Sequence, residues 1–253
     1  MSIVLALVCA IAFVAIFRIP IQRHPAVFYV LALALDALLL VGQSIGMPVI
    51  VWRTVLSLHS RCLFAFALFA IVMFIGALKD GSKLKTLLLP IRAELSILAT
   101  LLVVGHVWNY ASVYIAKLAS GTFGSDMIGA CVAFALVAVL IPLAVTSIKA
   151  VKRRMDGKTW KRVQRFAYVF WGLVYAHVTF VLGFSAAAGG ASAQESLAVY
   201  TILFALYLTC RFVRFATDRS ATGKEQEARF VPSPTRSRAA DENAASPSIE
   251  IGG

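Results

Sequence analysis

The sequence predicts an all-α membrane protein, a polytopic bundle of about seven transmembrane helices with its N-terminus outside and its C-terminus inside. Hydrophobic residues make up 60% of the 253 positions, the mean hydropathy is +0.84, and only 14% of the residues are charged. Soluble domains carry about 25% charged residues. Apolar runs also recur along most of the chain, and basic residues gather in alternate loops between them.

A spanning helix needs about 20 mostly apolar residues. The first apolar run could be a signal peptide, but it lacks a basic segment before it and a small-x-small cleavage site after it. We therefore expect it to be retained as a helix. Seven runs reach or approach the spanning length: 2–17, 26–45, 62–78, 95–116, 127–148, 166–187 and 197–213.

The basic residues set the predicted orientation, because cytoplasmic loops accumulate Lys and Arg. The loops after the first, third and fifth runs, together with Arg211 at the end of the last run and the segment that follows it, hold 21 of the 24 Lys and Arg. The loops after the second, fourth and sixth runs hold three. We expect the second set of loops to lie outside the cell.

Composition argues against two classes of partner. The net charge is +12, but the cations lie between apolar runs and near the C-terminus, with no aromatic-rich polar domain that could bind nucleic acid. The four cysteines lack the CxxC or Cys/His spacing of a zinc site, so we interpret them as small apolar residues. They are Cys9, Cys62, Cys131 and Cys210.

From about residue 214 the chain is rich in Ser, Ala, Pro, Glu and Arg and poor in large apolar residues. Such a segment cannot bury enough surface to offset its ordering entropy. The predicted organisation is therefore an extra N-terminal helix and loop over 1–25, a six-helix core over 26–213 and a disordered cytoplasmic tail over 214–253. We expect no flavin or nucleotide domain in that tail.

Two histidines lie inside apolar runs, where a polar ring is costly and needs a partner. Glu94 and Phe166 mark the inner starts of the two runs. His106 stands 12 residues beyond Glu94, and His177 stands 11 residues beyond Phe166. At 1.5 Å per residue both are roughly 16–18 Å deep. The other two histidines, His24 and His59, are expected in loops.

Two neutral imidazoles at equal depth on neighbouring helices are what bis-histidine ligation of a haem requires. Gly105 and Gly172 lie near the two rings and could leave room for a flat macrocycle. The alternative is that both histidines are hydrogen-bonded to neighbouring helices. A different metal would lack a third ligand in this sequence.

Three short segments around these residues resemble conserved segments of a known family. Arg92-Ala-Glu-Leu-Ser96 is followed by His106 and Tyr110. Pro142-Leu-Ala-Val-Thr-Ser147 looks like a PLxxTS segment, and Trp160-Lys-Arg-Val-Gln-Arg165 followed by His177 looks like WxxLHR…H. In order and spacing, over about residues 62–213, they resemble the ferric reductase-like transmembrane family, particularly its haem-binding MsrQ/YedZ branch.

This resemblance implies a b-type haem held by His106 and His177, with Arg92, Gln164 and Tyr110 as further cofactor-binding residues. Gln164 stands where the family has a histidine, and 95–116 holds no second histidine. Because Gln is a poor haem ligand, we expect one haem b per chain. Gln164 would then make a polar contact at the cytoplasmic rim, for which FMN or a quinone headgroup is a candidate.

The function implied is that of a membrane cytochrome subunit in the bacterial cytoplasmic membrane. Electrons would pass from a quinol or a cytosolic flavoprotein through the haem to an extracytoplasmic acceptor. Without a flavin domain of its own, the chain would be the electron-transfer subunit of an oxidoreductase rather than a complete enzyme. A transporter or an assembly and anchor factor without a redox centre is the alternative.

Asp36, inside the second run, is open to a proton-relay role or a purely structural one.

Overall fold

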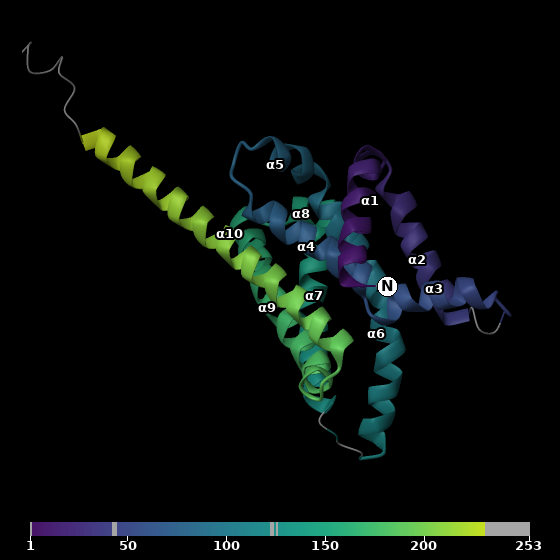
Figure 1. The fold of residues 1–253 in the computed structure, drawn as a ribbon. Helices are drawn as coiled ribbons and strands as arrows, with labels where there is room; N and C mark the ends of the chain where they lie inside the picture. The colour runs from purple at the N-terminus through teal and green to yellow at the C-terminus, as the bar shows by residue number, and fades with distance from the viewer. Residues whose placement is uncertain (1, 42–44, 122–123, 125, 231–253) are drawn as a thin grey trace, which may run out of the picture. The chain divides into compact units, whose positions relative to one another are not determined.

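The computed structural model describes residues 2–41, 45–121, 124 and 126–230. Every secondary-structure element in these ranges is a helix, which confirms the predicted all-α class. The chain divides into two compact units, residues 1–208 and 209–253, which we describe separately. The helices of Figure 1 are α1 (Ile3–Arg23), α2 (Pro25–Val41), α3 (Val49–Ser60), α4 (Leu63–Ala77), α5 (Lys83–Leu88), the 3-10 turn η1 (Leu89–Ile91), α6 (Arg92–Ala119), α7 (Asp126–Ser147), α8 (Lys149–Arg154), α9 (Gly157–Ala187) and α10 (Ala191–Phe230).

Five helical segments among the described residues are long and apolar enough to cross a membrane: Ile3–Arg23, Lys83–Ala119, Met127–Ser147, Gly157–Ala187 and Ala191–Ser220. The other two predicted spans correspond to α2 and α4, which have 17 and 15 residues. At 1.5 Å per residue they are about 25 and 22 Å long, against a hydrocarbon core of about 30 Å. The number of spans and their orientation therefore stay predictions.

Helix α4 lies at the centre of the first unit. Eleven of its 15 residues are buried, because its sequence is apolar on every side and its neighbours cover it all round. It packs against α1 and α6. On α1 the buried positions Ala6, Ala10 and Val14 follow helical spacing, and their small side chains allow close approach.

Aromatic rings join α4 to α9 and to the first part of α10. Trp171 of α9 is stacked between Phe66 of α4 and Phe204 of α10, with ring centroids 5.4 and 4.4 Å away. Tyr200 meets the edge of Phe66 at 4.8 Å. Stacked and edge-on pairs add to the apolar contact that holds these three helices together.

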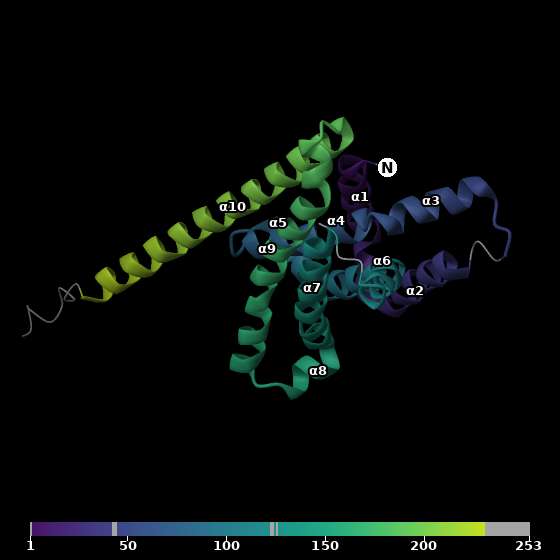
Figure 2. The same ribbon diagram turned by 90° about the horizontal axis from the view of Figure 1, so that it is seen from below.

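Helices α7 and α9 run side by side in both views (Figures 1 and 2) and share the most extensive interface in the unit. At Gly129 of α7 the two helices are in contact, since a β-carbon there would lie 3.7 Å from the Val181 side chain, an ordinary van der Waals distance. The start of α9 is fixed by Asp156, whose carboxylate accepts hydrogen bonds from the backbone N–H groups of Lys158 and Thr159.

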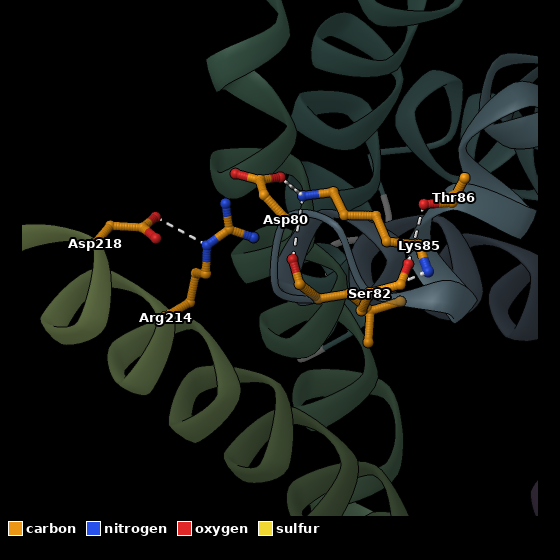
Figure 3. Close-up of polar contacts among 7 residues, drawn as sticks. Asp80, Ser82, Lys85, Thr86, Arg214 and Asp218 are labelled. Atoms are coloured by element: carbon orange, nitrogen blue, oxygen red, sulfur yellow. Dashed lines mark hydrogen bonds and ion pairs between the residues drawn. The ribbon is translucent and has the colours of Figure 1, made fainter. Parts of the chain in front are cut away.

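The loop after α4 is closed by a lysine, as Figure 3 shows. Lys85 Nζ donates to the Asp80 carboxylate at 2.6 Å and to the Leu78 carbonyl at 3.1 Å. Ser82 caps α5 by accepting from the Lys85 backbone N–H. In the second unit, Arg214 and Asp218 form an ion pair one helical turn apart.

Several helices extend beyond the apolar runs that predicted them. Helix α9 begins at Gly157, nine residues before residue 166, because its charged first turns are capped and still favour a helix. The segment 46–61 was expected to be a loop but contains α3, so the expectation that His59 lies in a loop is wrong. The α10 helix continues to Phe230, through part of the predicted tail; residues 231–253 lie outside the described residues.

Candidate functional site

His177 lies on α9 and faces the beginning of α7. Its Nδ1 is 3.2 Å from the backbone carbonyl oxygen of Gly129, and the side chain is half-buried. The bond forms where α7 and α9 pack against each other. With Nδ1 donating to a carbonyl, Nε2 carries the free lone pair of the neutral ring and can bind a metal.

His106 lies halfway along α6, where the packing of that helix changes. The buried residues of α6 all occur before it, the last being Gly105. His106 itself is half-buried, and its ring lies 4.9 Å from the ring of Tyr110, one turn further along. Tyr110 is exposed, as is Trp108 at 65%. The half of α6 beyond His106 therefore lacks the close packing of its first half.

The two histidine-bearing helices share a neighbour. Helix α7 packs against both α6 and α9, whereas α6 and α9 have no extensive interface among the described residues. His106 lies thirteen residues before α6 ends, and His177 ten residues before α9 ends. Measured along the helices, these positions are about 20 and 15 Å from the helix ends, so equal depth stays a prediction.

A cluster of hydrogen bonds joins the end of α7 to the beginning of α9, and it connects two of the three family-like segments. Gln164 Nε2 donates to the Thr146 hydroxyl at 2.9 Å, and the Thr146 hydroxyl donates to the Pro142 carbonyl at 2.7 Å. Trp160 Nε1 donates to the Thr146 carbonyl at 3.0 Å. Thr146 is buried, so these bonds satisfy polar atoms that water cannot reach.

The third family-like segment begins α6. The Arg92 guanidinium lies against α4, because Nη2 would be 3.7 Å from a β-carbon at Gly76. Glu94 is buried and forms an ion pair with Lys149 of α8 at 2.6 Å, while the lysine side chain is 67% exposed. The second carboxylate oxygen of Glu94 has no hydrogen-bond partner among the described residues. This ion pair links the beginnings of α6 and α8.

The structure therefore places the predicted site residues in two groups. Gln164 and Arg92 make helix-to-helix contacts near the basic loops, whereas His106, Tyr110 and His177 lie further along their helices. Sequence reasoning missed Thr146 and the Glu94–Lys149 pair as polar contacts. A signal for Glu94 existed, since a carboxylate beside an apolar run needs a partner. Among the described residues, no group of three or more His, Cys, Asp or Glu could hold a metal ion.

These features define the chain as an all-α, multi-pass membrane protein. It is similar to an uncharacterized protein of Treponema pallidum (strain Nichols), with 39% identity over 168 residues. That match covers 65% of this chain and 45% of the relative, so the chain spans less than half the length of the protein it matches. No protein-family model matches the chain, and no solved structure matches it.

Proposed function

We propose that this chain is a haem-binding subunit of a membrane electron-transfer complex, with His106 and His177 as the axial ligands of one b-type haem. The observation that carries the proposal is the bond between His177 Nδ1 and the Gly129 carbonyl. Metal-bound histidines almost always donate their other ring N–H to a carbonyl, carboxylate or water, which fixes the tautomer and the direction of the ligating nitrogen.

The surroundings of His106 also support the proposal. An imidazole on a membrane-spanning helix is costly, and this one lies where the close packing of α6 ends. A flat ligand between α6 and α9 could be bound by both half-buried rings and would cover apolar surface. The lack of an extensive α6–α9 interface among the described residues is compatible with such a ligand.

A haem bound at these positions would supply a one-electron carrier inside the bilayer. The chain's own part is to present two neutral imidazoles, hold His177 in one tautomer through Gly129, and exclude water with apolar helices. An exchange of electrons with a quinol or cytosolic flavoprotein on one side, and with an extracytoplasmic acceptor on the other, completes the proposed role.

The test is an absorption spectrum of the detergent-purified protein, oxidised and then reduced with dithionite. We expect a Soret band that shifts on reduction in the unmodified protein and is lost in His106→Ala and in His177→Ala. His24→Ala is the matched control, because His24 lies between α1 and α2 and ends the first helix. A full Soret band in either of the first two variants would remove that residue from the ligand set.

An absent Soret band in a folded protein purified from haem-supplied cells would contradict the proposal. The chain would then be a transporter or an anchor without a redox centre. Circular dichroism and gel filtration of the same preparation establish whether the protein is folded. They also separate loss of haem from loss of structure in the two histidine variants.

A further inference from the structure

We infer that the beginning of α9 and the adjoining α8 form a binding surface for anionic phospholipid headgroups. This inference does not depend on the proposed haem. Residues 149–165 contain eight Lys and Arg, all of them exposed, and one acidic residue, Asp156. The Asp156 carboxylate is engaged at the start of α9, where it caps two backbone N–H groups. Lys149 is paired with Glu94 of α6. The other seven cations make the surface strongly and locally positive.

The cations on α9 lie on one face of the helix. Lys158, Lys161, Arg162 and Arg165 recur at the spacing i, i+3, i+4 and i+7, which places them in a single stripe. We call these four residues the cation stripe. None of them forms an ion pair with a carboxylate among the described residues.

The opposite face of α9 is held against α7. Trp160 and Gln164, on that face, donate to the Thr146 carbonyl and hydroxyl. From α8, Lys152 places its ammonium 4.4 Å from the centre of the Trp160 ring, so the two basic elements are in contact. These contacts fix the direction of the cation stripe, and a rigid surface loses less entropy when it binds a headgroup than a flexible tail does.

The stripe also has the right length and position. It extends over eight residues, Lys158 to Arg165, which is about 10 Å along the helix. A headgroup layer is about 5–8 Å thick on each side of the hydrocarbon. Directly after Arg165 come Phe166, Tyr168 and Val169, all exposed apolar or aromatic residues that suit the edge of the hydrocarbon. Arginine offers paired donors to a phosphate, and lysine adds a compact charge.

The occupant is therefore a lipid with net negative charge. A zwitterionic headgroup carries its own ammonium, which the stripe would repel. Basic residues at the surface of an anionic leaflet attract it, and each is worth up to about a fivefold change in association. A soluble acidic protein would meet the same charges but would gain nothing from the apolar residues that continue the surface along α9.

The experiment uses the full chain reconstituted in phosphatidylcholine bilayers that contain a trace of spin-labelled lipid. Electron paramagnetic resonance then gives the association of labelled phosphatidylglycerol relative to labelled phosphatidylcholine. We expect a preference for phosphatidylglycerol that falls by at least about twofold in Lys158→Gln/Lys161→Gln. The matched control is Lys79→Gln/Lys83→Gln, two exposed lysines in the α4–α5 region whose removal changes the net charge equally.

Arg162→Lys/Arg165→Lys keeps the charge of the stripe and should retain most of the preference. Equal losses in the stripe and control variants would show a general effect of net charge and overturn the inference. An unmodified protein without any preference would overturn it as well. If the preference for phosphatidylglycerol is unchanged in Lys158→Gln/Lys161→Gln, the cation stripe does not bind the lipid and the inference is wrong. These cations would then serve another partner, such as an acidic protein surface.

Discussion

At the residue scale, Thr146 joins α7 to α9 through both its side-chain hydroxyl and its backbone carbonyl. It accepts from Gln164, donates to Pro142, and contributes the carbonyl that binds Trp160. Hydrogen bonds between membrane helices are worth about 0.6 kcal/mol on average and up to about 1.7 kcal/mol. Each hydrogen bond of the junction therefore contributes little to stability, but together they fix the orientation of α7 relative to α9.

A double-mutant cycle on this pair should give a coupling of about 0.6–1.7 kcal/mol. The variants are Thr146→Val, Gln164→Leu and the two combined. We expect each single change to destabilise the protein because it leaves the other polar group without this partner. The measurement is unfolding in a titration with sodium dodecyl sulfate, and strictly additive effects would mean that the bond contributes nothing.

The identity of residue 164 also bears on the number of haems. Because Gln164 bonds to Thr146, its amide is engaged within the chain. If the proposed haem binds, haemochrome quantification should give about one haem per chain. We expect Gln164→His to leave that ratio unchanged, because 95–116 offers no second histidine opposite it. A reproducible ratio of two would mean that other residues or another chain supply ligands.

At the scale of elements, the ion pair between Glu94 and Lys149 is asymmetric. The carboxylate is 3% exposed and the lysine side chain 67%. Removing the exposed cation leaves a buried charge with no counterion, whereas removing the buried charge leaves a lysine that water can solvate. The two ends of the pair should therefore differ in how well they tolerate neutralisation.

We expect Lys149→Gln to lower the stability more than Glu94→Gln does, by roughly 1–3 kcal/mol. The double variant should recover most of the loss, because no buried charge remains. Detergent unfolding followed by circular dichroism measures all three differences. If Glu94→Gln is the more damaging change, the carboxylate has a role beyond balancing Lys149.

The turn between α9 and α10 depends on two glycines. Gly189 has a φ of +86°, and a β-carbon on Gly190 would lie 2.8 Å from the Ser185 backbone oxygen. Gly190→Ala should cost about 1–3 kcal/mol, because the helix end must shift to make room. Gly157→Ala is the control, since a β-carbon there meets nothing within 4 Å, and it should be neutral in the same thermal-shift assay.

At the scale of the whole molecule, the predicted orientation follows from 21 basic residues on one side against three on the other. In a cysteine-free background, labelling of Gly157→Cys with a membrane-impermeant maleimide should require permeabilised cells. Labelling of Gly190→Cys should occur in intact cells. Access to residue 157 from outside would show that the positive-inside argument fails for this chain.

Composition and the length of apolar runs were sufficient to predict the helical class and the approximate positions of the long helices. Both follow from the free-energy cost of placing polar groups in the apolar core of a bilayer. They could not predict α3, since Pro48, Arg53 and Arg61 interrupt the hydropathy of that segment. The His177–Gly129 bond was equally beyond sequence, because it depends on how closely α7 approaches α9. Two histidines could be identified as candidates, but their mutual geometry depends on tertiary packing.

The short connection between α9 and α10 has a consequence for biosynthesis. Ala188, Gly189 and Gly190 separate the two long apolar helices, and none of these three residues is charged. The connection itself therefore adds no charge that has to cross the bilayer, and the contact between Trp171 and Phe204 can form once both helices have left the translocation channel. We therefore expect α9 and α10 to insert together as a helical hairpin, after the preceding helices have provided a surface for α9.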